Sequence, residues 1–167
     1  MIAPLRIVID TREQAPWAWD PSDAVTEVRA LSAGDYALES DCERVKGRAT
    51  LAVRFAVERK SLNDFAQSVS SNYERFLREM DRAATWPARI VIGEFNFEDL
   101  CFSQVGNEVI PPPHNHPSLR PSFMIRRIAE LAMSNITVLM CGDAQKASAM
   151  ALHLFRRRIS DVKGVPR

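Results

Sequence analysis

The segment Phe55–Phe65 constrains the fold most, because a strand pattern gives way to a helix pattern within eleven residues. Residues two apart on a strand share a face, so Glu58 and Lys60 project together and Arg59 points the other way. A carboxylate beside an ammonium group suits metal-assisted hydrolysis. The acid holds a divalent cation, and the lysine orients or helps to deprotonate the attacking water, or stabilises developing charge.

Three further acids stand beside predicted strands. The apolar run 5–10 is typical of a buried strand and ends in Asp10, with Glu13 three residues farther on. The run 25–31 is more mixed, but its place shortly before Asp35 favours a strand there too. Each acid therefore lies close to a turn at a strand end, where neighbouring strands bring side chains together.

These acids and the lysine together suggest a site for a divalent cation. Mg²⁺ takes oxygen ligands, uses one or two carboxylates and keeps waters for a substrate phosphate. We expect Asp35 and Glu58 to be the main ligand pair and Asp10 to be a third oxygen source. Glu13 is assigned to the surroundings of the metal. The hypothesis requires these ligands to converge with Lys60 in the folded chain.

Each of these residues also has a purely structural interpretation. A Glu-Arg-Lys triplet is common on solvated surfaces, an Asp after Gly often completes a turn, and an Asp at a strand end often caps a helix. Asp64 has the strongest such alternative, because Ser61 and Asp64 have the spacing of a capping box. The joint presence of strand-end acids and a lysine in one small domain favours a catalytic site.

The whole chain has the pattern of an α/β domain, since strands and helices alternate along it. The expected strands are 5–10, 25–31, 36–38, 51–57, 89–93 and 136–140, and the expected helices are 61–84, 118–134 and 143–159. Residues 68–72 interrupt the pattern of the first helix, which two helices would also satisfy. We interpret 36–57 as a long hairpin with a charged tip near Lys46, and 95–117 as a loop with a short helical turn near 98–101.

Two tryptophans follow the first strand. Trp17 and Trp19 lie in a loop between prolines. Stacking on nucleic-acid bases is one role for them. We favour the other role, in which they close the hydrophobic core.

The motifs and their order resemble the nuclease domain of the XPF-like structure-specific endonucleases. That family carries a strand ending in Asp-x-Arg-Glu, then Gly-Asp, then Glu-Arg-Lys-x-x-x-Asp. The corresponding residues here are 10–13, 34–35 and 58–64, and the resemblance extends from Leu5 to about Arg158. It implies an α/β fold with a restriction-endonuclease-like core, in which a mixed central sheet is flanked by helices.

The resemblance also implies an activity, namely Mg²⁺- or Mn²⁺-dependent hydrolysis of DNA phosphodiester bonds. By resemblance, the metal is bound by Asp10, Asp35 and Glu58. Lys60 serves the nucleophile, and Arg59 assists. Flaps, forks and other branched DNA are the implied substrates.

Basic residues near the predicted site are the candidate DNA contacts. The resemblance assigns Arg75 to a segment that presents a basic side chain to the site, and Arg78 lies one turn farther along the same predicted helix. Lys46 and Arg48 stand at the tip of the predicted hairpin. Family members also dimerise through their last two helices, so a homodimer is one role for the apolar residues there, and a core role explains them equally well.

The chain departs from the family pattern in three places. The hairpin 36–57 is longer than usual, and the strand 89–93 is followed by Gly93-Glu94 in place of Glu-Gly, so no role is assigned to Glu94. We expect one nuclease domain over 1–167 and no helix-hairpin-helix domain, which weakens the argument for branched substrates.

Composition excludes several other classes of protein. The chain has 167 residues, a net charge of +1 and no apolar run long enough to span a bilayer. We therefore expect a soluble intracellular protein, cytoplasmic or nucleoid-associated, or nuclear in a eukaryote. Its three cysteines lack Cys-x-x-Cys spacing, which argues against structural zinc and favours free thiols.

Two other functions compete with a branch-specific endonuclease. The first is a non-catalytic DNA-binding or partner subunit of the same fold, which the presence of every motif acid and of Lys60 disfavours. The second is a less structure-selective nuclease of a phage or mobile element, which only substrate assays would separate from a branch-specific endonuclease.

Overall fold

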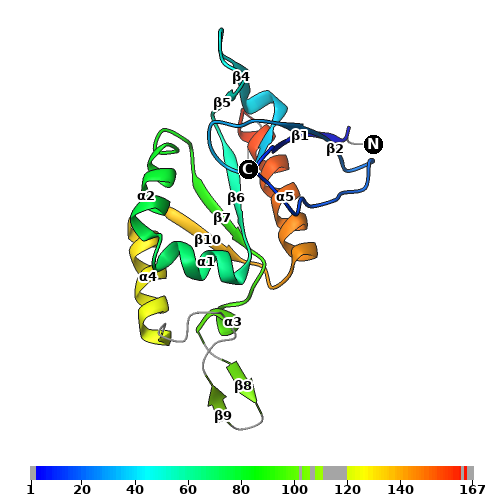
Figure 1. The fold of residues 1–167 in the computed structure, drawn as a ribbon. Helices are drawn as coiled ribbons and strands as arrows, with labels where there is room; N and C mark the ends of the chain where they lie inside the picture. Colours follow the sequence, from blue (N-terminus) through cyan, green and yellow to red (C-terminus); the bar gives the residue numbers. More distant parts are fainter. Residues whose placement is uncertain (1–2, 102, 106–107, 111–119, 163, 165–167) are drawn as a thin grey trace.

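A six-stranded mixed sheet forms the centre of the molecule (Figure 1). The computed structural model describes residues 3–101, 103–105, 108–110, 120–162 and 164. The strands lie in the order β10-β7-β6-β3-β1-β2. Their bounds are β1 Leu5–Asp10, β2 Ala24–Arg29, β3 Tyr36–Leu38, β6 Ala56–Lys60, β7 Arg89–Gly93 and β10 Ile136–Met140.

The pairing directions make the sheet mixed. β3 is antiparallel to both of its neighbours, β1 and β6, whereas β1–β2, β6–β7 and β7–β10 are parallel pairs. The apolar side chains of β7 and of most of β1 are buried, as expected for strands that are covered on both faces.

Helices cover both faces of this sheet. In Figure 1, α5 lies against one face and α1, α2 and α4 lie against the other. Their bounds are α1 Leu62–Val69, α2 Tyr73–Asp81, α4 Pro121–Met133 and α5 Ala144–Val162. The alternation of β7 shows the two layers, because Ile90 and Ile92 pack with α5 while Val91 packs with the other helices. The predicted fold class is therefore confirmed.

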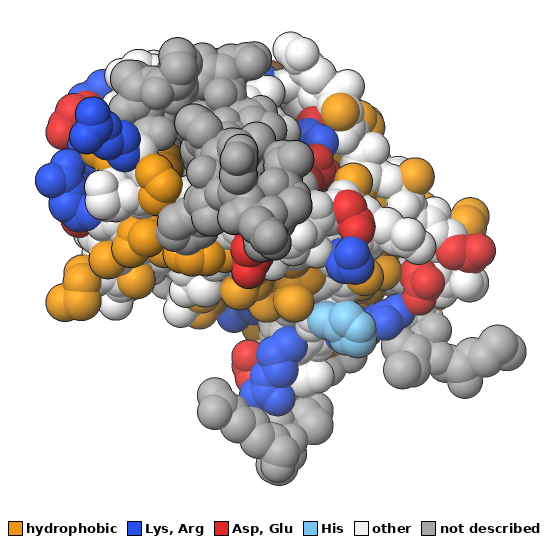
Figure 2. Space-filling model, turned by 90° about the horizontal axis from the view of Figure 1, so that it is seen from below, with side chains coloured by type: hydrophobic (Ala, Val, Ile, Leu, Met, Phe, Trp, Pro, Cys, Tyr) orange, Lys and Arg blue, Asp and Glu red, His pale blue; other side chains and the backbone are white. Residues whose placement is uncertain are grey.

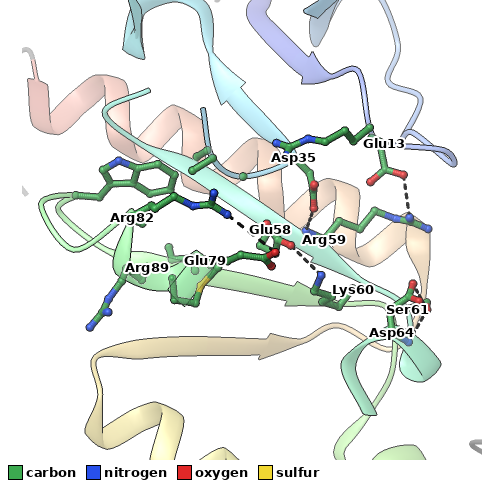
Figure 3. A pocket seen from close by; sticks show the side chains of 18 of the residues that line it. Glu13, Asp35, Glu58, Arg59, Lys60, Ser61, Asp64, Glu79, Arg82 and Arg89 are labelled. Carbon is green, nitrogen blue, oxygen red and sulfur yellow. Dashed lines mark hydrogen bonds and ion pairs between the residues drawn. The ribbon is translucent and has the colours of Figure 1, made fainter. Parts of the chain in front are cut away.

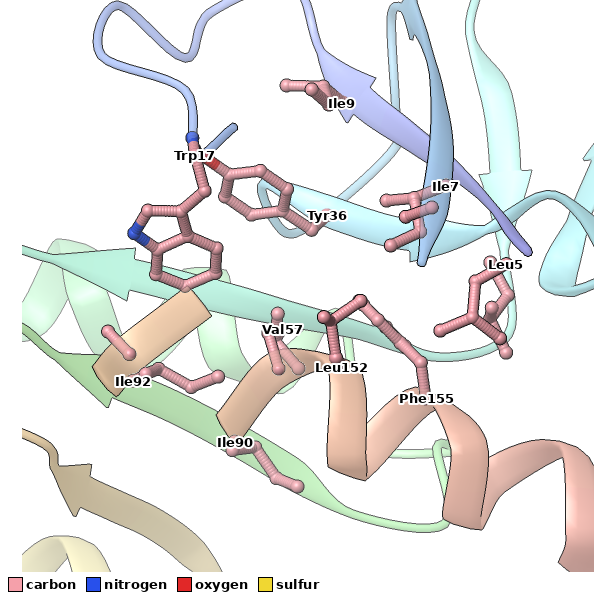
Figure 4. Close-up of a cluster of buried hydrophobic side chains, with 14 of the residues drawn as sticks. Leu5, Ile7, Ile9, Trp17, Tyr36, Val57, Ile90, Ile92, Leu152 and Phe155 are labelled. Atoms are coloured by element: carbon pink, nitrogen blue, oxygen red, sulfur yellow. Dashed lines mark hydrogen bonds between the residues drawn. The ribbon is translucent and has the colours of Figure 1, made fainter. Parts of the chain in front are cut away.

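The two tryptophans of the first loop belong to the core. Trp17 is stacked on Tyr36, with ring centroids 4.5 Å apart, and its backbone N–H donates to the Tyr36 hydroxyl over 2.9 Å. Figure 4 shows this pair above α5, where Leu152 and Phe155 point toward the sheet. Trp19 packs edge-on against both rings. The core-closing role predicted for these residues is confirmed.

The stretch 36–57 forms the predicted hairpin, but in two parts. β3 pairs with β6 at its base, and β4 (Cys42–Arg44) pairs with β5 (Leu51–Val53) farther out. A 3-10 turn, Glu39–Asp41, interrupts one arm. The other arm breaks at Arg54, whose backbone N–H donates to the Asp41 carbonyl. A single strand over 51–57 was therefore wrong.

Other element bounds also differ from the prediction. The first helical segment is two helices, and the Ser70 hydroxyl between them donates to the Ala66 carbonyl over 2.6 Å, which competes with continued helix. The expected loop 95–117 contains α3 (Phe97–Cys101) and a small hairpin of β8 (Ser103–Val105) and β9 (Glu108–Ile110), while 111–117 lie outside the described residues.

Two further findings concern membrane-spanning helices and the cysteines. Within the described part, no helix is both long enough and apolar enough to cross a bilayer. Cys42, Cys101 and Cys141 are free thiols, as predicted.

The turn before β3 depends on a glycine. Gly34 has φ +77°, and a Cβ atom at this position would lie 2.5 Å from the Cβ of Ala56 on β6. This close approach lets the Asp35 N–H donate to the Val57 carbonyl over 2.9 Å, while the Asp35 carbonyl accepts from the Asp10 N–H over 2.8 Å. Gly34 therefore locks the backbone of Asp35 between two strands.

We predict that Gly34→Ala destabilises the protein by about 2–4 kcal/mol, because it combines an unfavourable left-handed backbone with a steric clash. Gly47→Ala is the matched control, since Gly47 has φ +80° and nothing within 4 Å of an added Cβ. It should cost only about 1 kcal/mol. Urea unfolding measures both values, and equal losses would contradict the role given to the close approach.

Candidate active site

An open hollow of about 680 Å³ lies beside the exposed half of β6 (Figure 3). Its walls come from six regions: the loop after β1, the turn before β3, the strand β6, the start of α1, α2 with the segment that follows it, and the start of β7. The polar residues that line it include Asp35, Glu58, Lys60, Ser61, Asp64 and Glu79. The hollow is therefore built around the segment that the sequence singled out.

Asp35, Glu58 and Lys60 come together in this hollow. The Lys60 ammonium donates to Glu58 Oε1 over 2.8 Å, as the two-residue repeat of β6 requires. Asp35 approaches from the neighbouring strand, and its Oδ2 accepts from the Arg59 backbone N–H over 2.7 Å. Figure 3 shows the three side chains pointing into the same space.

Burial and crowding control the charge of this group. Burial, followed by the nearby charge of Glu58, raises the pKa of Asp35 to about 8. Burial alone would lower the pKa of Lys60, but the charge and hydrogen bond of Glu58 outweigh it and raise that pKa. In the metal-free protein, the two acids are thus crowded together and share one lysine.

This arrangement fits a divalent cation. Two close carboxylates that repel each other would be relieved by a metal ion, and Mg²⁺ is commonly held by one or two carboxylates with water filling the other positions. Asp35 and Glu58 are the residues that would hold it. In the described part of the chain, no group of three or more Asp, Glu, His and Cys residues is placed to bind a metal ion.

Asp10 does not join this group. It is 1% exposed and does not line the hollow. Its Oδ1 accepts from the backbone N–H and the Nε of Arg12 over 2.8 and 2.6 Å, and its Oδ2 accepts from the Leu31 N–H over 2.6 Å. Burial would raise the pKa of Asp10, but these bonds lower it. Asp10 therefore lies outside the lining of the hollow that holds Asp35, Glu58 and Lys60, and both of its oxygens accept hydrogen bonds within the protein.

Arg59 is held on the opposite side of β6. Its Nε and Nη2 donate to the two oxygens of Glu94, each over 2.7 Å, and its Nη1 donates to Glu13 over 3.2 Å. Glu94 also accepts from the Trp17 indole N–H over 2.6 Å. Glu13 and Arg59 both line the hollow, and there two acids, Glu13 and Glu94, neutralise Arg59.

Glu94 is the site residue that sequence reasoning missed. The parallel pairing of β6 and β7 places Gly93 opposite Lys60, so the next residue lies at the same end of the sheet as Arg59. The Glu94 N–H donates to the Lys60 carbonyl over 2.9 Å. The sequence does place Arg59 and Glu94 at the ends of two strands. Predicting that they meet also requires knowing that these two strands are parallel neighbours in the sheet.

The remaining predicted residues divide between the hollow and the surface. Ser61 caps α1, since its hydroxyl oxygen accepts from the Asp64 N–H over 3.2 Å, as the predicted spacing requires. The Ser61 hydroxyl in turn donates to Asp64 Oδ2 over 2.6 Å. Arg75 lines the hollow and pairs with Glu79 at 3.4 Å. Three other basic residues are exposed and do not line it: Arg78 on α2, and Lys46 and Arg48 near the tip of the hairpin β4–β5.

We predict that Asp35→Asn stabilises the metal-free protein at high pH. In the unfolded chain Asp35 loses its proton near pH 3.8, whereas the folded chain keeps it up to about pH 8. The wild-type free energy of unfolding therefore falls as pH rises through this window, and asparagine removes that fall. The expected gain is on the order of 1–3 kcal/mol at pH 8 and near zero at pH 4.

Urea unfolding in EDTA across this pH range tests the prediction. Added Mg²⁺ should stabilise the wild-type protein and not Asp35→Asn, which lacks a carboxylate for the ion. A gain of the same size at every pH would show that Asp35 is not strained by its charge.

Comparison with solved structures supports the fold. Two solved structures of XPF from Aeropyrum pernix share the fold. The one described as a complex with DNA has a TM-score of 0.59 and 21% identity, covering 94% of this chain and 66% of that chain. The other has a TM-score of 0.52 and 22% identity, covering 95% and 69%. This chain thus spans about two thirds of their length.

Sequence comparison gives the family. No curated protein matches the chain in sequence. The model of the ERCC4 domain, however, matches residues 9–154, which include all three motifs. The resemblance to XPF-like nucleases is thereby confirmed at the level of family and fold, and this chain belongs to the ERCC4 domain family.

Proposed function

We propose that this protein is a Mg²⁺- or Mn²⁺-dependent DNA endonuclease that hydrolyses phosphodiester bonds, with branched DNA as its preferred substrate. The observation that carries the proposal is the meeting of Asp35, Glu58 and Lys60 in one open hollow. Membership of the ERCC4 domain family and the fold shared with XPF support it.

The chemistry assigns a role to each of these side chains. A divalent cation held by Asp35 and Glu58 would polarise the phosphate and make a bound water more acidic. Lys60 remains protonated beside Glu58, so we assign it to orienting the water and to neutralising charge on the phosphate, rather than to removing a proton. Arg59 is a positioning residue, because its backbone N–H holds Asp35 and its guanidinium is tied to Glu94.

DNA contacts are proposed from charge and position. Arg75 lines the hollow and is 70% exposed, so it is free to reach a phosphate with little loss of its pairing to Glu79. The exposed Lys46, Arg48 and Arg78 are assigned to more distant phosphates. The structure described as XPF in complex with DNA supports DNA as the substrate, and branched DNA follows from the family resemblance.

A homodimer through the last two helices is part of this proposal. The exposed side chains of Ile125 and Met133 on α4 and of Met150 on α5 support it, being 42%, 86% and 39% exposed. Figure 2 shows hydrophobic side chains gathered across one face of the molecule, among groups of Lys and Arg. Leu154, by contrast, packs against the core and serves the fold.

Two alternatives remain distinct from the main proposal. A non-catalytic DNA-binding or partner subunit would need no paired acids, so the crowded Asp35 and Glu58 disfavour it. A less structure-selective nuclease of a phage or mobile element would use the same hollow. Cleavage of plain duplex or single strands as fast as of flaps and forks would favour that second alternative.

We predict that Glu58→Gln and Lys60→Ala each lower metal-dependent cleavage of labelled flap DNA by about 100-fold or more, because both groups act in the transition state. The matched controls are Glu74→Gln, which changes an exposed acid of α2, and Lys146→Ala, which changes an exposed lysine of α5. Neither control residue lines the hollow. Full activity in either site variant would refute this assignment.

Asp10→Asn separates the structural role of Asp10 from metal binding. It should lower the free energy of unfolding by about 1–3 kcal/mol, because it weakens buried hydrogen bonds to Arg12 and Leu31. The Mg²⁺ concentration that gives half-maximal cleavage should stay within about twofold of the wild-type value, because Asp10 does not line the hollow and its change should be independent of the metal site. A tenfold rise in that concentration would restore Asp10 to the metal ligands.

We predict that Glu94→Gln lowers kcat by about 10-fold with little change in KM, because Arg59 would lose its two-point anchor and no longer hold the Asp35 loop precisely. It should also cost about 1–3 kcal/mol of stability, since Arg59 is only 15% exposed. Glu39→Gln breaks the exposed pair with Arg6 and is the control, with an expected cost below about 0.5 kcal/mol. If Glu94→Gln and Glu39→Gln changed kcat and the free energy of unfolding by the same amounts, Glu94 would be an ordinary surface acid.

A further inference from the structure

The catalytic hollow has a second, apolar half. Its polar half surrounds Glu58 and Lys60, toward the end of β6. The start of β6 is lined instead by small and apolar side chains and by one indole ring: Ala33, Ala56, Ala83, Trp86 and Ile90. Trp86 is the one aromatic residue among the described residues that line the hollow. Hydrolysis of a phosphodiester does not by itself require this apolar half.

Trp86 is held rigidly. Its indole N–H donates to the Val53 carbonyl over 3.0 Å, and its backbone N–H donates to the Ala83 carbonyl over 3.0 Å. The ring also makes an edge contact with Phe55, with centroids 6.4 Å apart. The side chain is nevertheless only half-buried and lines open space. A flat surface is thus fixed in place with part of it exposed to the hollow.

This surface lies close to the catalytic acids. The Cη2 atom of Trp86 is 3.6 Å from the position of a Cβ on Gly34, the residue before Asp35. Ala56 and Glu58 share one face of β6 two residues apart, which corresponds to about 7 Å along the strand. A nucleotide whose phosphate lies at the acids would therefore reach Trp86 with its own base or with the next one.

The flanking charges fit a nucleic-acid strand at this place. Arg82 lines the same half, and its side chain is 57% exposed. Its ion pair with Glu79 is weak, because the two charged atoms are 4.0 Å apart. A neutral ring offers nothing to a phosphate, but every base has a π-face that stacks on an aromatic side chain. In a duplex, those faces are covered by neighbouring bases, so a paired internal base has none to offer.

We propose that Trp86 is a stacking platform for an unpaired nucleobase of the strand that is cut, adjacent to the scissile phosphate. This inference rests on the proposed nuclease function and defines its substrate more closely. The strand enters the hollow as a single strand, and the cut falls beside an unpaired nucleotide. Trp86 hydrogen-bonds to Val53 at the base of the hairpin β4–β5. The DNA strand therefore continues along this hairpin toward Lys46 and Arg48 at its tip.

A purely structural role for Trp86 makes a different prediction. In that role the indole closes the small core cluster with Ala56 and Val53, and its loss would slow every substrate equally. In a stacking role, removing the indole lowers the cleavage rate only when the DNA carries a base at the position that stacks on it. The discriminating measurement is therefore a cycle that combines a protein variant with a DNA variant.

The first experiment measures kcat/KM on flap DNA whose single strand carries one abasic nucleotide, moved stepwise past the cutting position. With wild-type protein, one position next to the cut should lower kcat/KM by about 10-fold. Trp86→Leu should lower kcat/KM on intact DNA by a similar factor and be indifferent to the abasic nucleotide. Trp86→Phe, which still stacks, should lose less than about threefold.

The overturning result is equally clear. If Trp86→Leu slows intact and abasic DNA by the same factor, or if wild-type protein tolerates abasic nucleotides everywhere, the residue is structural. Where Trp86→Leu folds poorly, the scan with wild-type protein can still overturn the proposal without any variant, and Trp86→Tyr takes the place of Trp86→Leu in the cycle as a ring of smaller stacking area.

The second experiment measures binding without cleavage. Glu58→Gln protein in EDTA is titrated with labelled oligothymidine, while label anisotropy reports binding and tryptophan fluorescence reports stacking. Quenching should occur in this protein, persist when Trp19→Phe is added and disappear when Trp86→Phe is added. The remaining indoles are reliable silent controls, because Trp17 and Trp19 pack with the α5 side of the sheet.

The outcomes separate this inference from the proposed function. Binding with cleavage by wild-type protein, but without Trp86-dependent quenching, overturns the stacking platform and leaves the nuclease intact. Absence of both binding and metal-dependent cleavage overturns the nuclease, and the inference with it.

Discussion

The two-residue repeat of β6 is the constraint on which the site depends. Val57 packs in the core on the α5 side of the sheet and Arg59 turns toward Glu94, while Glu58 and Lys60 point together into the hollow. One short strand therefore supplies a core residue, an anchored arginine and two reactive groups. A shift of one residue in its pairing would exchange these faces and bury the lysine against the core. The parallel and antiparallel neighbours that hold β6 in register are thus part of the chemistry.

The site also requires that Asp35, the acid beside Glu58, be held as firmly as β6. Asp35 is held by backbone bonds on both sides, and Gly34 permits the approach to Ala56 that makes them possible. The carboxylate is thereby brought to Glu58 although burial and repulsion disfavour its charge. Such tension is tolerated where the surrounding fold over-determines the geometry, and it leaves the protein poised for a cation.

Local periodicity explains what the sequence could predict. Apolar runs marked the strands of the central sheet, the spacing of Ser61 and Asp64 marked the start of α1, and alternation on β6 placed Glu58 beside Lys60. Local periodicity could not predict contacts between segments that are far apart in the sequence. The Glu94–Arg59 pair requires knowledge that β6 and β7 are adjacent. The hydrogen bonds of Asp10 to Arg12 and Leu31 likewise arise only from the folded loops.

The near-neutral net charge conceals how unevenly the acids are used. Asp10 is paired with Arg12, Glu13 and Glu94 share Arg59, and Asp41 pairs with Arg158 at 2.8 Å. Arginines thus neutralise these structural acids, while Asp35 and Glu58 have a single lysine between them. The demand for a further cation arises from this pairing pattern rather than from bulk charge. The same pattern leaves Arg75 and Arg82, with their weak partners, as the cations most accessible to a phosphate backbone.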